Sequence, residues 1–232
     1  MIHAAPVERF DLRMAGHGWD FATAERRRID AYWREVVAER PYLWNGDVLI
    51  CVTAELSGGL LSARFAQTDF ASFVAWRDWG WPDRAARSCF GVPVVMSSDG
   101  ALLVGVMGPK TLNEGKVYPP SGSLEPRDID AKGCVNIGHS MAVELREETG
   151  LDLAAAMAGK AVAIFEGQRL AVARRYDFAM SFAEIEEAFQ CHNAAESTPE
   201  LARIEAIRDT SQIDARMPSY AQEIIRQFLD AR

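Results

Sequence analysis

Lysine is scarce in this chain, and positive charge as a whole is outweighed by negative charge. The 232 residues contain 25 lysines and arginines against 33 aspartates and glutamates, which gives a net charge of −8. Proteins that bind a nucleic-acid backbone need clustered lysines and arginines, whereas the arginines here are scattered. The charge balance therefore predicts that the chain has no nucleic-acid partner.

Long apolar runs are also missing, since no stretch approaches the roughly 18 apolar residues of a membrane-spanning helix. The first residues lack the basic region and apolar core of a secretory signal. The cysteines are far apart and form no CxxC pair, which argues against a zinc site and is typical of free thiols in a reducing compartment. These cysteines are Cys51, Cys89, Cys134 and Cys191. With 49% hydrophobic residues, we expect a globular cytoplasmic protein that contacts no membrane.

The most informative pattern lies in residues 143–151, where three glutamates recur at helical spacing. Residues three and four positions apart share one face of a helix, so Glu144, Glu147 and Glu148 are expected to project to one side. Like charges at this spacing repel one another. A divalent cation such as Mg²⁺ or Mn²⁺ would offset the repulsion and bridge to substrate phosphates. The alternative is an ordinary solvated helix face, partly balanced by Arg146.

A loop precedes this predicted helix, because residues 117–126 pass from a short apolar run into proline, serine and glycine. The order of strand, loop and acidic helix resembles the Nudix hydrolases. Their signature is Gly, five residues, Glu, seven residues, then Arg-Glu-aliphatic-any-Glu-Glu-any-Gly-aliphatic. The second half of this signature is matched by Glu144, Leu145, Glu147, Glu148, Gly150 and Leu151.

The chain departs from the signature in its first half. With Gly122 as the leading glycine, Asp128 stands where the family has Glu, and Val143 stands where the family has Arg. Fourteen residues separate Asp128 from Val143 where the signature allows seven, which predicts a seven-residue insertion roughly within 129–138. In the family, the arginine helps to hold the catalytic helix and its acidic residues, so its replacement bears directly on activity.

The resemblance implies an α/β (α+β) fold, a Nudix-type α/β/α sandwich around a mixed sheet. It also implies hydrolysis of the diphosphate linkage in a nucleoside diphosphate joined to another moiety, as in a nucleotide sugar, a dinucleotide or a CoA derivative. By residue-for-residue match, the Mg²⁺ or Mn²⁺ ligands would be Glu144, Glu147 and Glu148. We assign Glu144 and Glu147 as catalytic residues, although the general base is open between Glu144 and an acidic cluster in residues 184–187.

Two residues are predicted to contact substrate. The loop around Gly122 would offer a backbone carbonyl, and Arg174, near a strand end, would pair with phosphate or with neighbouring acids. Lys110 and Lys116 are either phosphate contacts or solvated lysines, and His139 is either a substrate contact or a surface histidine. The resemblance also makes a homodimer reasonable. A second hypothesis, motivated by Val143 and the stretched signature, is a catalytically weak or inactive nucleotide-binding or regulatory protein of the same fold.

Residues 1–85 are expected to form an N-terminal extension or subdomain, and residues 86–232 the Nudix domain. Within the extension, residues 1–19 are predicted to be irregular, 22–39 an amphipathic helix, and 48–55 with 60–67 a hairpin around a Ser-Gly-Gly turn. A second helix is expected to follow a cap at Thr68 or Asp69. The tryptophan-rich segment 76–81 is either a stacking platform for a nucleotide base or core packing.

In the second part, residues 90–96 and 101–107 predict a hairpin around an Asp-Gly turn. Residues 161–165 and 170–176 predict a second strand pair, and 182–192 predict a helix with Ile185 and Phe189 facing inward. Residues 201–208 fit a strand or a helix, and 220–229 predict a terminal helix.

Overall fold

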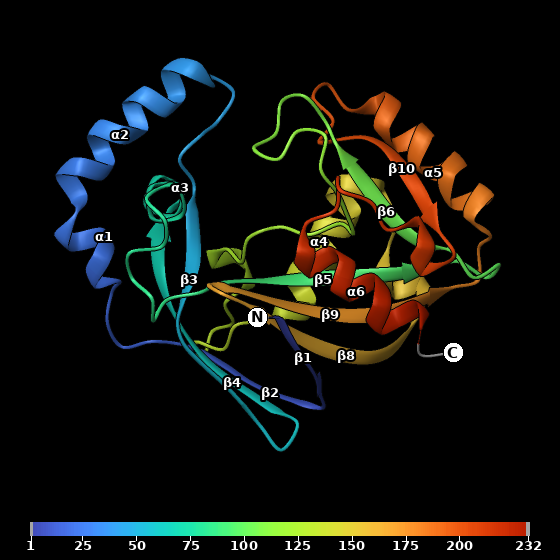
Figure 1. Ribbon diagram of the computed structural model, residues 1–232, viewed down its shortest axis with the longest axis horizontal. Helices are drawn as coiled ribbons and strands as arrows, with labels where there is room; N and C mark the ends of the chain where they lie inside the picture. The colour runs from blue at the N-terminus through green and yellow to red at the C-terminus, as the bar shows by residue number, and fades with distance from the viewer. Residues whose placement is uncertain (1, 231–232) are drawn as a thin grey trace.

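The computed structural model describes residues 2–230 and contains two β-sheets flanked by helices (Figure 1). The larger sheet has seven strands in the order β1-β8-β9-β5-β6-β10, with β7 also paired to β6. Its strands are β1 (Ile2–Val7), β5 (Ser88–Met96), β6 (Leu102–Met107), β7 (Val117–Tyr118), β8 (Ala156–Glu166), β9 (Arg169–Phe178) and β10 (Leu201–Ile207). The sheet is mixed, because β5 and β9 run parallel while the other pairs are antiparallel.

Helices cover both faces of the larger sheet. Gly91 of β5 lies directly against Ile137 and Met141 of helix α4 (Ile137–Thr149), whereas the neighbouring Phe90 contacts Tyr220 of helix α6 (Ser219–Leu229). Successive residues of a strand point to opposite faces, so α4 and α6 lie on opposite sides of the sheet (Figure 1). Helix α5 (Phe182–Ala195) packs against α4 and β10. The expected α/β/α sandwich around a mixed sheet is confirmed.

The predicted strand and helix types in the second part are confirmed, with one difference in pairing. The turn between β5 and β6 forms, yet the two strands pair only at Met96 and Leu102 and then diverge (Figure 1). Strand β5 pairs instead with β9, and β6 pairs with β10. Residues 201–207, left open between strand and helix, are a strand because they complete the edge next to β6. Short 3₁₀ turns are η1 (Pro126–Asp128), η2 (Leu153–Ala155) and η3 (Thr210–Gln212).

The smaller sheet is built from the N-terminal third of the chain. Strand β4 (Leu60–Asp69) pairs with β3 (Asp47–Ser57) on one side and with β2 (Arg9–Met14) on the other. Helices α1 (Asp20–Ala24), α2 (Arg26–Glu39) and α3 (Phe70–Asp78) pack beside it. The predicted hairpin and Asp69 cap are confirmed, since the Asp69 carboxylate accepts a hydrogen bond from the Ser72 amide at 2.7 Å. The predicted first helix is interrupted at Glu25 and forms α1 and α2.

The prediction that residues 1–19 are irregular is wrong for most of that segment. Residues 2–7 form β1, which adds to the larger sheet beside β8, and residues 9–14 form β2. Strand β1 is an edge strand, where Pro6 is tolerated because one side of the strand makes no sheet hydrogen bonds. Its pairing depends on β8, about 150 residues away, so the local pattern did not reveal it. One hydrophobic core then runs through both sheets and includes Leu12, Phe65 and Val92.

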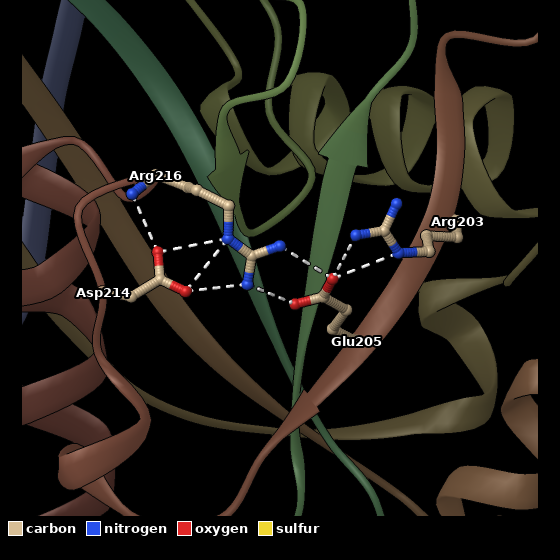
Figure 2. Close-up of polar contacts among 4 residues, drawn as sticks. All are labelled: Arg203, Glu205, Asp214 and Arg216. Carbon is tan, nitrogen blue, oxygen red and sulfur yellow. Dashed lines mark hydrogen bonds and ion pairs between the residues drawn. The ribbon is translucent and has the colours of Figure 1, made fainter.

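Ion pairs fasten the segment between β10 and α6. Arg216 binds Glu205 of β10 at 2.9 Å and Asp214 at 2.7 Å, and Glu205 also binds Arg203 (Figure 2). The Arg216 carbonyl accepts a hydrogen bond from the Val117 amide of β7. Surface ion pairs are individually weak, but a network on one segment limits how it moves. The network holds in place the segment that leads into α6, and Tyr220 of α6 belongs to the hydrophobic core.

Among the described residues, none of the helices is both long enough and apolar enough to cross a bilayer. The four cysteines are free thiols, and two of them, Cys51 and Cys89, are buried.

Candidate active site

A cavity of about 1050 Å³ lies between helix α3 with the loop before β3 on one side and the larger sheet with α4 on the other. Its lining comes from the α2–β3 loop, α3, the loop after β6, the segment before η1, α4, α5 and the start of α6. In Figure 1 the loop after β6 extends toward the N-terminal part of the molecule. Residues more than 100 positions apart in sequence therefore share this cavity, whose size suits a small-molecule ligand.

Helix α4 places the three predicted glutamates along this cavity, and two of them are buried. The helix begins after Asn136, whose side chain accepts a hydrogen bond from the His139 amide at 3.0 Å, and ends at Gly150 in the left-handed conformation, φ 76°. Asparagine caps and left-handed glycines are the residues that helix ends favour. Glu144 and Glu148 lie one turn apart on this helix and both line the cavity.

Both of these glutamates are buried, with 8% of Glu144 and 5% of Glu148 exposed. Burial raises the pKa of Glu144 to about 8, although the charge of Arg127 opposes the shift. Burial, together with the negative charges of Glu200 and Glu144, raises the pKa of Glu148 well above its usual range. One oxygen of Glu148, Oε1, accepts a hydrogen bond from the Ser121 amide at 3.2 Å. The other, Oε2, is buried and has no hydrogen-bond partner within residues 2–230.

Glu147, the third predicted glutamate, also lines the cavity but is exposed to solvent. It is tied to Arg127, whose Nη1 lies 2.8 Å from Glu147 Oε1. The same guanidinium reaches Glu144 Oε1 at 3.2 Å and Glu125 Oε2 at 3.0 Å. Hydrogen bonding to Glu147 raises the pKa of Arg127, so this arginine stays charged. The three α4 carboxylates line one cavity, and the Arg127 guanidinium pairs with two of them, Glu144 and Glu147.

The sequence analysis missed Arg127. The family pattern led us to look for an arginine at Val143, which is half-buried on α4, and Arg127 comes from η1 in the preceding loop. A guanidinium thus reaches the helix carboxylates from another element. The signal available in the sequence was only that Arg127 stands beside Asp128, and its contacts with Glu144 and Glu147 depend on how the loop folds back.

Gly122 lies against Glu144. A Cβ atom built on Gly122 would overlap the Glu144 carboxylate, so only glycine leaves room for this side chain in its present position. The adjacent Ser121 donates its amide to Glu148. The structure therefore brings the predicted loop residue and the predicted carboxylates together.

Asp128 and the segment that follows it lie outside the cavity lining of the described residues. Asp128 is buried, and its Oδ1 lies 2.8 Å from His139 Nδ1, while its Oδ2 accepts from the Glu125 amide. This pairing places His139 at the loop rather than in the cavity lining of the described chain. Within residues 129–138, where the sequence analysis places a seven-residue insertion, the Val135 amide donates to the Leu12 carbonyl of β2 at 2.9 Å. This segment thus connects the loop before α4 to the N-terminal third.

Of the other residues predicted to act at the site, some line the cavity and some do not. Arg174 lies outside the cavity lining that the described residues form, and its Nε donates to the Gly159 carbonyl at 3.3 Å. Arg169, at the start of the same strand, does line the cavity, as do Lys110 and Lys116. None of Glu184, Glu186 and Glu187 is part of this described lining, and Glu184 instead accepts from the Ser181 amide to cap α5.

A hard divalent cation fits the chemistry of the buried carboxylates. Magnesium is usually held by one or two carboxylates, with waters and substrate phosphates completing its shell. Glu144 and Glu148 supply two carboxylates in one cavity, and the unpartnered Glu148 Oε2 is an oxygen available to a ligand. Within residues 2–230, no cluster of three or more His, Cys, Asp or Glu side chains is arranged to hold a metal.

One further carboxylate belongs to the same cavity. Glu200, just before β10, has a pKa raised by the loss of surrounding water and by the charge of Glu147, although the residue as a whole is exposed. Its negative charge acts on Glu148. The cavity therefore gathers more negative charge than sequence spacing on α4 alone indicates.

No family model and no curated protein matches the chain. Similar solved structures include a protein from Deinococcus radiodurans, 12% identical, covering 61% of this chain and 83% of that one with a TM-score of 0.43. A bifunctional NMN adenylyltransferase/ADP ribose pyrophosphatase from Francisella tularensis, complexed with AMP and a Mn ion, is 16% identical with a TM-score of 0.44. That match covers 68% of this chain and 46%, about half, of the Francisella chain. A Nudix hydrolase from M. smegmatis is 13% identical, covering 62% and 84%, with a TM-score of 0.39.

Proposed function

We propose that this protein is a Mg²⁺- or Mn²⁺-dependent hydrolase of the Nudix type that cleaves the diphosphate linkage of a nucleoside diphosphate joined to another moiety. The observation that carries the proposal is the pair of buried carboxylates, Glu144 and Glu148, in the large cavity. Two buried acids one helix turn apart repel when both are ionised. A cation between the pair and a phosphate would remove that repulsion and account for the unpartnered Glu148 oxygen.

Water attacks one phosphorus of the diphosphate, the bridging P–O bond breaks, and two phosphate monoesters leave. A bound divalent cation would neutralise charge on the phosphoryl oxygens and lower the pKa of the attacking water. Glu144 and Glu148 would hold the cation, and the loop around Gly122 would offer it a backbone carbonyl. Lys110 and Lys116, which line the cavity, would bind the leaving phosphate.

The proton from the attacking water requires a general base near the carboxylates. We assign Glu144 to this role because it is buried in the cavity beside Glu148, whereas the acidic cluster in residues 184–187 lies outside the cavity lining of the described residues. Glu147 is more exposed and is held by Arg127, so we assign it to positioning and to the outer part of the cation site. Arg127 would keep both glutamates in place as the charge on phosphate changes.

A second candidate is a binding or regulatory protein that has lost hydrolysis. The contacts of Arg127 favour it, since this guanidinium already pairs with Glu144 and Glu147 and Val143 stands in place of the family arginine. In this case the cavity would bind a nucleotide without turnover.

Chromatographic detection of phosphate monoesters formed from a panel of nucleotide sugars, ADP-ribose, dinucleotides and CoA derivatives, with Mg²⁺ or Mn²⁺ and with EDTA, separates the two candidates. The hydrolase predicts cation-dependent cleavage of at least one compound into two monoesters. Tight nucleotide binding without turnover of any compound would favour the regulator. A homodimer and a cytoplasmic location also remain predictions, and light scattering in solution tests the first.

A further inference from the structure

Tyr220, in the first turn of α6, is a buried residue whose hydroxyl group has no partner. Only 8% of the residue is exposed, and its ring packs against Phe90 at 5.3 Å between ring centroids. Tyr220 nevertheless lines the large cavity, and its hydroxyl makes no hydrogen bond within residues 2–230. Buried polar groups are normally hydrogen-bonded, so an unpaired hydroxyl at a cavity wall points to an acceptor on a ligand.

This hydroxyl is a hydrogen-bond donor at neutral pH. Burial raises the pKa of the Tyr220 phenol, and the charge of Arg169 opposes the shift. The charges of Glu148 and Glu166 raise the pKa further. The phenol therefore stays protonated near neutral pH, and its O–H can donate to an acceptor in the cavity.

Arg169 brings positive charge to the same part of the cavity lining. Its guanidinium lies over the Trp81 ring, 5.5 Å from the centroid, and its Nη1 lies 3.7 Å from Glu166 Oε2, beyond hydrogen-bond distance. The guanidinium makes no hydrogen bond with any residue of the described chain, so its N–H donors are available. Trp81 packs in turn on Trp76, which is fully buried, so core packing is confirmed for Trp76 in the tryptophan-rich segment.

The N-terminus of α6 adds backbone donors beside Tyr220. The helix begins after Pro218 without a side-chain cap, and the Ala221 and Gln222 amides donate to the Pro218 carbonyl. The Ser219 and Tyr220 amides therefore have no partner within the helix. Such a helix end carries partial positive charge and favours anions. Pro218 and Tyr220 both line the cavity, which places this end at the ligand space.

Two contacts hold this turn of α6 in position. The Ser219 hydroxyl donates to the Glu166 carboxylate at the end of β8, and the ion pairs of Arg216 hold the preceding segment (Figure 2). Glu166 is not part of the cavity lining that the described residues form. It therefore supports Arg169 and Ser219 from outside the space that a ligand would occupy, and the donors around Tyr220 are preorganised.

We propose that Tyr220, Arg169 and the first turn of α6 bind a phosphate group of the substrate that lies outside the diphosphate linkage. The proposal rests on the proposed function, in which the diphosphate already has the cation and two lysines as partners, and it names the substrate class, a nucleotide derivative with an additional phosphate monoester. A phenol, a guanidinium and free amides match a phosphate, which accepts several charge-assisted hydrogen bonds. An uncharged sugar would offer the Arg169 guanidinium no anion.

Calorimetric titration in EDTA tests this site without turnover. The ligands are two matched pairs, NADP with NAD and CoA with dephospho-CoA, whose members differ by one phosphate monoester outside the diphosphate. We expect the phosphorylated member of at least one pair to bind about 10-fold or more tightly, as for hydrogen bonds to a charged group. Tyr220→Phe should remove most of this preference and leave the affinity for the other member unchanged. Because the hydroxyl has no partner in the free protein, this variant should keep the wild-type Tm.

Tyr176→Phe is the matched control. Tyr176 is also a buried tyrosine, but it lies on β9 outside the described cavity lining, and its hydroxyl contacts the Met141 sulfur. This variant should keep the full preference for the phosphorylated member. Inorganic phosphate, titrated at constant ionic strength, should bind the wild-type chain and Tyr176→Phe equally, and Tyr220→Phe about 10-fold more weakly.

Several results would overturn the proposal. These are no binding of either phosphorylated nucleotide, equal affinities within both pairs, or phosphate binding that is indifferent to Tyr220→Phe. Equal weakening of both members of a pair by Tyr220→Phe would place the diphosphate itself at Tyr220 and would also overturn it. The hydrolase assay is decided separately. Binding that depends on Tyr220 without any cleavage would remove the enzyme and keep the site, whereas cleavage without that dependence would do the reverse.

Discussion

Gly122 and Glu144 fit so closely that a side chain at residue 122 would occupy the space of the Glu144 carboxylate. The loop that carries Gly122 also donates the Ser121 amide to Glu148. One short segment therefore fixes both buried carboxylates of α4. This contact connects the first half of the signature, which the sequence matches loosely, with the second half, which it matches well.

Gly122→Ala should lower the hydrolysis rate while leaving the fold intact, because the new methyl group must displace the Glu144 side chain. We expect a loss of roughly 100-fold, the usual effect of misplacing a catalytic group by about 1 Å. Gly16→Ala is the control, since nothing lies within 4 Å of a Cβ there. Steady-state rates of both variants, with circular dichroism to verify folding, measure the difference. Equal rates in the two variants would show that the close fit has no functional role.

Glu148→Gln should reduce the hydrolysis rate by roughly 100-fold or more. The substitution removes the carboxylate charge that would hold the cation, and the cation would stabilise the negative charge that develops on the phosphoryl oxygens. The side chains have the same shape, so the fold should persist. Glu187→Gln, an exposed residue on α5 outside the cavity, should keep full activity. An unchanged rate in Glu148→Gln would remove this residue from the cation site.

The sequence predicted α4 and its neighbourhood well because the signals there are local. Helical spacing of Glu144 and Glu148, and a glycine at residue 150, are read within two turns of one helix. The terminal helix and the β8–β9 pair were found in the same way. The sandwich architecture was implied by the family resemblance, and the mixture of strands and helices in the second part fits it.

Contacts between distant segments were the part that the sequence could not supply. Strand β1 depends on pairing with β8, and Arg127 meets Glu144 only because the loop folds back over α4. Trp44 was read as part of a turn, and its place in the cavity depends on the bonds between that turn and α3. Arg174 was chosen from its position near a strand end, whereas its neighbours on β8 and β9 decide where it points.

Arg127→Ala should destabilise the protein by about 1 kcal/mol at pH 8, within the range for partly exposed ion pairs, and by less at pH 5. The reason is that the Arg127 charge lowers the pKa of Glu144, and this interaction matters only when Glu144 is ionised. Urea unfolding at the two pH values measures the effect. Arg146→Ala is the control, because Arg146 pairs with the exposed Asp152 and should show no such dependence.

Adding an arginine on α4 tests whether a positive charge on the helix itself can replace Arg127 beside Glu147. In Arg127→Ala, the added Val143→Arg change places a cation four residues before Glu147, a spacing at which opposite charges attract. It should recover part of the stability and part of the hydrolysis rate. No recovery of either, with the fold intact, would mean that Arg127 has a separate role.

The metal-free protein should lose stability as pH rises from about 5 to 8. A carboxyl whose pKa is about 8 when folded and 4.5 when unfolded binds more protons in the folded state, so the free energy of unfolding falls across this range. The raised pKa values of Glu148 and Glu200 act in the same direction. Thermal melts in EDTA should show Tm falling by on the order of 10 °C. Added Mn²⁺ should raise Tm more at pH 8 than at pH 5, and a Tm that is level or rising in EDTA would contradict the burial of these acids.

Direct binding of Mn²⁺, followed by electron paramagnetic resonance at pH 8 without substrate, examines the carboxylate pair itself. The wild-type chain and Glu187→Gln should bind the ion with equal affinity. Glu148→Gln should bind it at least about 10-fold more weakly, as expected when a group that holds a metal is removed. Equal Mn²⁺ affinity in all three proteins, or no binding to the wild-type chain, would contradict the claim that these buried glutamates hold a divalent cation.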